Sequence, residues 1–242
     1  MEIYNFSYDD ENDALNSLSM YYGISVEKIK SKLNEINTLL KNDALEWDSG
    51  TYAWHIRLLL DAEPEQKNMK IRVSYYHRCG SDGTLEWFKE GLLHCPEGIK
   101  IFLNKTINIV PELTEYKGEI LRRSVIHLND ESNGEANGPF AFSTLREAKV
   151  RNEFDLPELF FGNTGQFSFV QDLVPIQEKL KIKLKPTIVK FYKEYNPENI
   201  DCIVCNYWQL ICQKFDESFT SDSLDVGKGK NIPFEQIQEI FI

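Results

Sequence analysis

The sequence lacks the features that mark several large protein classes. None of its 242 residues lies in a run that approaches the roughly 18 consecutive apolar residues needed to span a membrane. Residues 1–10 contain neither the basic segment nor the apolar core of a signal peptide, so we expect none. With 42% hydrophobic and 27% charged residues, the composition excludes collagen-like, disulfide-rich and wholly disordered chains. We therefore expect a soluble globular protein.

Cysteine is scarce, with five residues whose number is odd and whose spacing is irregular. This pattern favours a reducing compartment over a secreted disulfide framework, so we expect a cytoplasmic protein. Cys202 and Cys205 form a CxxC pair, but zinc takes about four ligands, and neither a second pair nor two histidines follow nearby. We therefore expect the pair to pack in a core, and we expect no metal site.

Three motifs of common enzyme classes are also missing. The sequence contains no GxSxG of hydrolases, no P-loop and no GxGxxG of dinucleotide-binding folds. Its four histidines are too scattered to indicate a metal cluster. The local sequence therefore gives no signal for these classes.

Basic residues are in deficit, with 27 Lys and Arg against 38 Asp and Glu and a net charge of −11. Residues 1–66 alone hold five basic and thirteen acidic residues, a net charge of −8. A polyanionic surface repels phosphate backbones, which disfavours nucleic-acid binding. The acidity either keeps the chain soluble or attracts a basic protein partner. We place a boundary between an acidic helical segment, residues 1–66, and an α+β core domain, residues 67–242.

Hydrophobic spacing predicts two helices in the acidic segment. Residues 14–22 and 26–40 carry apolar side chains at three- and four-residue steps, with Gly23 ending the first helix and Ser25 capping the second. The turn between them resembles that of a helix-turn-helix, but the acidic surroundings favour a plain helical hairpin. Residues 51–60 are apolar and of uncertain type.

The remaining strands, helices and turn are predicted from alternating apolar and polar residues, from apolar residues at helical spacing and from turn-forming residues. Thr144 and Glu147 have the spacing of a capping box, which predicts the start of a helix. Together the pattern predicts an α+β fold with a mixed or antiparallel split-sheet core and an N-terminal helical segment. Strands are expected at residues 2–6, 69–76, 99–109, 119–128, 140–142, 181–192 and 234–242, helices at 84–93, 144–152 and 197–215, and a turn at 79–83.

One combination of segments resembles a known family. A strand that ends in Tyr75-Tyr76-His77-Arg78 is followed by a turn and by residues 85–93, which end in Gly-Leu-Leu. Residues 140–142 then lead through Ser and Thr into a helix, and residues 235–242 carry a late glutamate near a strand. This order resembles the ADP-ribosyltransferase fold, whose members bind NAD in a cleft between two sheets.

The resemblance implies an NAD-using transferase or NAD hydrolase, of a toxin type or a defence effector type. Its NAD-binding residues would be Tyr76, His77, Arg78 and Ser143, with an Arg–phosphate contact and an aromatic face for the nicotinamide. Glu239 would be the catalytic residue. A carboxylate beside the ribose stabilises the positive charge that develops as the nicotinamide bond breaks.

The chain also departs from the family's patterns, which keeps a second hypothesis open. Ile237 precedes Gln238 and Glu239 where one branch has a second acidic residue, and Phe140 and Phe142 occupy the segment where another branch has a tyrosine. The alternative is a non-catalytic, acidic protein-binding or immunity-type module. Such a module would bind a basic partner through its N-terminal segment.

Overall fold

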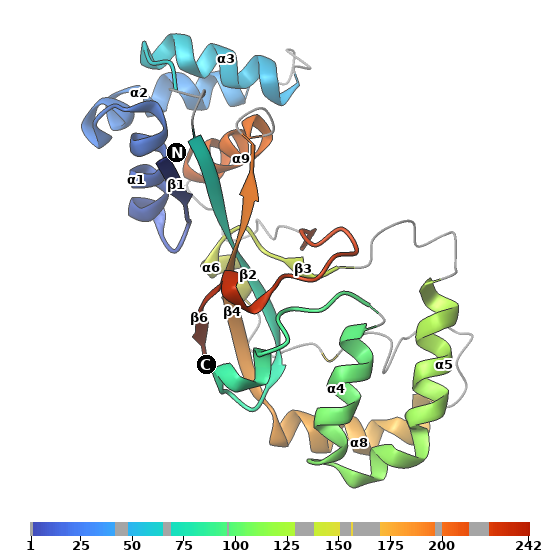
Figure 1. Ribbon diagram of the computed structural model, residues 1–242. Helices are drawn as coiled ribbons and strands as arrows, with labels where there is room; N and C mark the ends of the chain where they lie inside the picture. Colours follow the sequence, from blue (N-terminus) through green and yellow to red (C-terminus); the bar gives the residue numbers. More distant parts are fainter. Residues whose placement is uncertain are drawn as a thin grey trace. The chain divides into compact units, whose positions relative to one another are not determined.

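The structure is a computed structural model of the chain. It describes residues 2–41, 48–64, 69–95, 97–128, 138–150, 156, 170–196, 200–212 and 223–242. Within these residues the fold is α+β, as the sequence predicts, with helices and a mixed four-stranded sheet (Figure 1).

The four-stranded sheet has the strand order β1-β2-β4-β6. Its first two strands are parallel, so the chain between them must cross over, and it does so through three helices. The last two strands are antiparallel, which makes the sheet mixed. A separate antiparallel pair joins β3 and β5. The strands are β1 (Glu2–Phe6), β2 (Met69–Ser81), β3 (Phe140–Ala141), β4 (Lys185–Tyr195), β5 (Leu224–Asp225) and β6 (Ile237–Phe241).

The chain forms two compact units, and each is assembled from separate stretches of sequence. β2 and β4 each contribute to both units, whereas the sequence-based boundary lies at one point near residue 66. The first unit holds 11 basic and 20 acidic residues, a formal charge of −9, and the second holds 16 and 18, a charge of −2. The first unit comprises Met1–Tyr75, Ser143–Glu147 and Tyr192–Asp222, and the second comprises Tyr76–Phe142, Ala148–Phe191 and Ser223–Ile242.

The first unit contains the two predicted N-terminal helices, which end and begin as expected. Gly23 ends the first in the left-handed region, with φ of 62°, where a residue without Cβ is favoured. Ser25 Oγ accepts a hydrogen bond from the Lys28 backbone N–H at 3.2 Å. The apolar residues of uncertain type form a third helix, whose N-cap is Asp48. The helices of this unit are α1 (Glu11–Tyr22), α2 (Val26–Leu40), α3 (Ser49–Leu60) and α9 (Asp201–Cys212).

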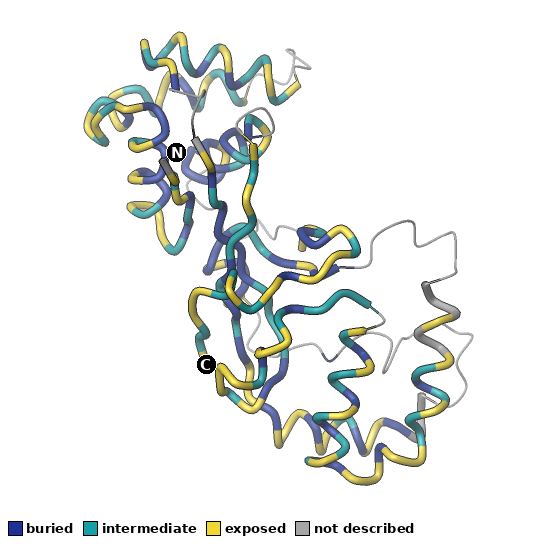
Figure 2. The backbone as a smooth tube through the Cα atoms, viewed as in Figure 1, coloured by how far each residue is buried: buried dark blue, intermediate teal, exposed yellow. Residues whose placement is uncertain are grey.

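Aromatic residues fill the core of the first unit, where β1 and the helices pack. The Phe6 ring lies 5.4 Å from that of Tyr21 and 5.5 Å from that of Tyr207. Trp208 donates its indole N–H to the Tyr22 hydroxyl at 3.3 Å. All five side chains are buried, and the buried stretches of these helices are dark blue in Figure 2. The helical stripe that predicts α9 is therefore confirmed as a core face.

The second unit contains a helical layer that the sequence interpretation missed. The strands expected at residues 99–109 and 119–128 are wrong, because the chain forms α4 (Glu97–Ile107) and α5 (Lys117–Leu128) there. Their buried side chains recur at helical spacing, as at Ile99 and Leu103. α8 (Val170–Lys183) packs in the same apolar cluster, which includes Ile99, Leu103, Val110, Leu113, Ile120, Leu156, Leu173, Ile176, Leu180 and Leu184.

β2 is longer than predicted, so the turn expected at residues 79–83 is wrong in its first part. The strand continues to Ser81, whose hydroxyl lies 2.7 Å from the Thr187 hydroxyl on β4. Thr187 Oγ1 donates to the Lys185 carbonyl, so Ser81 must donate to Thr187 while it accepts from the Gly83 N–H. Both hydroxyls are buried. This chain of hydrogen bonds keeps polar groups paired inside the sheet.

Candidate functional site

Three segments carry the resemblance to the ADP-ribosyltransferase family: residues 75–93, 140–142 and 235–242. The first two of these family-like segments pair directly through their backbones. Tyr76 on β2 donates its N–H to the Phe142 carbonyl at 3.0 Å, and Phe142 returns a bond of 2.9 Å to the Tyr76 carbonyl. The residues on either side of this antiparallel bridge are therefore held close together. The Tyr76 side chain is fully buried. Its ring therefore supports the sheet and does not face solvent.

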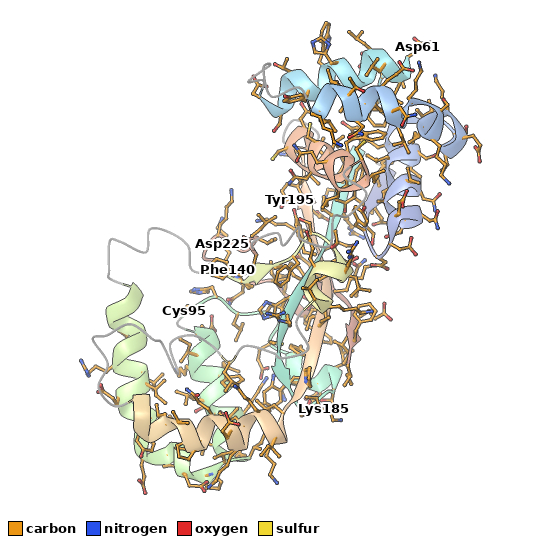
Figure 3. The ribbon with its side chains drawn as sticks, turned by 180° about the vertical axis from the view of Figure 1, so that it is seen from behind. Asp61, Cys95, Phe140, Lys185, Tyr195 and Asp225 are labelled. Atoms are coloured by element: carbon orange, nitrogen blue, oxygen red, sulfur yellow. The ribbon has the colours of Figure 1, made fainter. Side chains whose placement is uncertain are left out.

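His77 contacts the same segment through its side chain. Its Nδ1 lies 2.6 Å from the carbonyl oxygen of Phe140, and a carbonyl only accepts, so Nδ1 carries the hydrogen. Desolvation lowers the pKa of His77, opposed by this hydrogen bond and reinforced by the charge of Arg78. The imidazole is therefore favoured in its neutral form, with Nε2 able to accept. Phe140 itself pairs with Asp225 of β5, and both are labelled in Figure 3.

The guanidinium group of Arg78 lies beside residues 140–142. Its guanidinium carbon lies 5.6 Å from the centroid of the Phe142 ring, within the range of a cation–π contact. The residue is half-buried. Its charge is thus kept near the Phe140–Phe142 strand by an aromatic ring, in a position that suits an anionic group of a ligand.

Glu239 lies on β6, at the edge of the same sheet. It is exposed and lies directly opposite Lys190 of β4 in the strand register. The Lys190 ammonium lies 5.8 Å from the centroid of the Tyr76 ring. Lys190 therefore lies between Glu239, in residues 235–242, and Tyr76, in residues 75–78. A single sheet therefore carries Tyr76, Arg78 and Glu239, with His77 on the other face of β2 from Tyr76 and Arg78.

Ser143 directly follows Phe142, the bridge partner of Tyr76, and is half-buried. The predicted capping box is confirmed next to it: the Glu147 N–H donates to Thr144 Oγ1, and the Thr144 N–H donates to the Glu147 carboxylate, each at 3.1 Å. This box opens the short helix α6 (Leu145–Lys149). The predicted extension of the helix to residue 152 lies outside the described residues.

Two lysines near the site had no signal in the sequence motifs. Lys190 faces the site only because of the β4–β6 register, which no local pattern specifies. Lys149 Nζ lies 5.6 Å from the centroid of the Phe241 ring on β6. Arg78, Lys149 and Lys190 each lie over an aromatic ring, as Lys105 does over Trp87 elsewhere in the second unit. Cation–π contacts of this kind hold each positive charge beside an aromatic ring.

The cysteines of α9 differ from one another in burial. Cys205 is buried as expected and its thiol donates to the Ser49 carbonyl at 3.3 Å, whereas Cys202 is exposed, contrary to expectation. Desolvation raises the pKa of the Cys205 thiol to about 12 and that of Cys79 to about 12. Both are therefore protonated near neutral pH and are weak nucleophiles. Among the described residues, no group of three or more His, Cys, Asp or Glu is placed to hold a metal ion.

Comparisons of the chain with models of protein families, with curated proteins and with solved structures gave no match. None of the helices in the described part of the chain combines the length and the apolar composition that crossing a bilayer requires.

Proposed function

We propose that the second unit binds NAD and cleaves its nicotinamide–ribose bond, as a cytoplasmic ADP-ribosyltransferase or NAD hydrolase of a toxin or defence type. The observation that supports this is the meeting of segments far apart in sequence. Residues 76–78 lie against residues 140–142, and β6 with Glu239 follows in the same sheet. These are the segments that resemble the ADP-ribosyltransferase family.

The charges of the second unit suit this assignment. NAD carries two phosphates, and the unit is close to neutral, with a formal charge of −2 against −9 for the first unit. Arg78 and Lys190 would bind the phosphates, whereas His77, which points to the other face of β2, would hold residues 140–142 in place through its bond to the Phe140 carbonyl. The buried Tyr76 would position Lys190 and would not stack on the nicotinamide.

Glu239 would act on the ribose. When the C–N bond breaks, nicotinamide leaves with the bonding electron pair and positive charge develops on the ribose ring. A carboxylate near that ring stabilises the charge, and the oxygen of an acceptor or of water then bonds to the same carbon. The acceptor loses its proton in this step. Glu239 is exposed on an edge strand, so a substrate can approach it.

The proposal is tested with the purified chain by thermal shift and by nicotinamide release. A ligand that binds only the folded state raises the free energy of unfolding by about 2.7 kcal/mol at 100 times its dissociation constant. We expect NAD to raise the melting temperature with slow release of nicotinamide. ADP-ribose, which lacks nicotinamide, separates binding from cleavage. Absence of both a shift and released nicotinamide at about millimolar NAD would overturn the proposal.

The acidity of the first unit favours a second candidate function. Its formal charge of −9 includes exposed carboxylates at Glu11, Glu27 and Glu63. Such a surface attracts a basic protein partner, as a non-catalytic or immunity-type module would. Binding of a lysine-rich peptide should weaken as salt is raised from about 50 to 300 mM, because salt screens exposed charges. Changing the three glutamates to glutamine should weaken it similarly, and binding that ignores both changes contradicts this candidate.

A further inference from the structure

Helix α3 of the first unit carries an apolar stripe on its outer face. Trp54 is 51% exposed and Leu58, one turn later, is 55% exposed. Gly50 precedes Trp54 by one turn and is also exposed, without a side chain. The opposite face of α3 is buried through Ala53, Ile56 and Leu60.

The stripe lies between carboxylates at both ends. Asp48, the exposed N-cap, precedes it, and its Oδ1 accepts from the Thr51 N–H at 2.9 Å. Asp61, the exposed C-cap, follows it, and Glu63 is exposed two residues further on. The surface at both ends of the stripe is therefore negative, in agreement with the charge of the whole unit.

The cations near α3 do not cancel this charge at the stripe. Arg57 is turned toward Asp201, with 2.8 Å between Nη2 and Oδ1, and its side chain is only 15% exposed. Lys28 of α2 donates to the backbone carbonyl of Asp61 at 3.4 Å, so one cation lies near the C-terminal end of the stripe, where Asp61 and Glu63 supply two carboxylates. His55 contacts the stripe through its ring, 4.7 Å from that of Trp54.

We infer that this face of α3 binds a basic amphipathic helix of a partner protein. Trp54 and Leu58 are one helical turn apart, a spacing that fits apolar anchors at i and i+4 of a second helix. Basic residues that flank those anchors would meet Asp48 at one end and Asp61 with Glu63 at the other. The inference rests on the second candidate function and gives the basic partner a chemical class and a binding surface.

Two synthetic peptides of about 16 residues test the inference on the full chain. One places Leu and Lys so that a helix has one apolar and one basic face, and the other has the same composition in scrambled order. Fluorescence anisotropy of a labelled peptide gives the affinity. We expect the amphipathic peptide to bind about tenfold more tightly than the scrambled one, since exposed tryptophans in contact surfaces contribute strongly.

Variants locate the binding surface. Trp54→Ser with Leu58→Ser should remove the preference for the amphipathic peptide, and Leu58→Lys, which adds like charge, should weaken its binding further. Met20→Ser is the matched control, because Met20 is also 51% exposed and lies on α1. Asp61→Asn with Glu63→Gln should reduce the salt dependence.

The outcomes separate the two proposals. If both peptides bind equally and the α3 variants have no effect, the α3 surface is wrong while the basic partner stands. If neither peptide binds, both proposals are overturned. Equal loss in the Met20→Ser control would also contradict a site on α3.

Discussion

Lys190 of β4 lies directly opposite Glu239 of β6, and its ammonium lies 5.8 Å from the centroid of the Tyr76 ring on β2. One lysine thus has the proposed catalytic carboxylate on one side and the first family-like segment on the other. A half-buried cation in this position attracts phosphate groups, as the proposed binding of NAD requires.

Replacing Lys190 by methionine should weaken NAD binding while the fold is kept. A charged hydrogen bond contributes about 1.5–3 kcal/mol, so the KM for NAD should rise about tenfold or more. Steady-state nicotinamide release at varied NAD measures this change. Lys183→Met, which alters an exposed lysine of α8, is the control. Equal KM values for the Lys190→Met variant and the wild type would remove Lys190 from the site.

The pKa shift of His77 predicts a pH-dependent stability. Burial lowers its pKa below the usual value of about 6.5, so the unfolded chain binds the proton at higher pH than the folded chain does. This contribution to stability is complete above about pH 6.5 and is lost as the pH falls through the lower folded-state pKa. Urea unfolding between about pH 5 and 8 should show a weaker pH dependence for His77→Asn than for the wild type. Parallel curves would show that His77 does not contribute.

The paired hydroxyls of Ser81 and Thr187 should behave as a coupled unit. Ser81→Ala leaves the Gly83 N–H without its acceptor, and Thr187→Val leaves the Ser81 hydroxyl without its own acceptor. Each change should lower the free energy of unfolding by about 1–3 kcal/mol, because a buried polar group loses its partner. The double variant should lose less than the sum. Strict additivity in the double-mutant cycle would mean that the hydroxyls do not interact.

The capping box of α6 makes a smaller prediction. Thr144→Ala removes the acceptor of the Glu147 N–H and should destabilise the chain by about 1 kcal/mol, with a range of about 0.5–2 kcal/mol. Thr144→Ser keeps the hydroxyl and should stay within about 0.5 kcal/mol of the wild type. Chemical denaturation distinguishes the two variants. A serine variant as unstable as the alanine variant would assign the effect to the methyl group of threonine.

Local signals in the sequence predict helix ends correctly where a residue type has one dominant structural role. Gly23, Ser25 and the Thr144–Glu147 box predict helix ends, and the structure confirms each one. The buried face of α9 is equally clear, since apolar residues such as Val204, Trp208 and Ile211 recur at helical spacing along the helix.

Short apolar stretches without caps were ambiguous. Residues 99–109 resemble one or two strands around Asn104 and Lys105, but Ile99 and Leu103 are buried at helical spacing and pack in the apolar cluster of the second unit. Tertiary contacts of this kind override local propensity. Lys190 was missed for a similar reason. Its proximity to Glu239 arises from pairing between strands that lie far apart in sequence, which no local pattern encodes.

We propose that Glu239 stabilises the transition state of NAD cleavage. The most direct measurement is the rate of nicotinamide release by the wild type and by Glu239→Gln, with melting temperatures recorded for both. Glu239 is exposed on an edge strand, so the amide should leave the fold intact. We expect an unchanged melting temperature and a loss of turnover of about a hundredfold or more, as for removal of one charge-stabilising group. Unchanged nicotinamide release by the folded variant would contradict the claim.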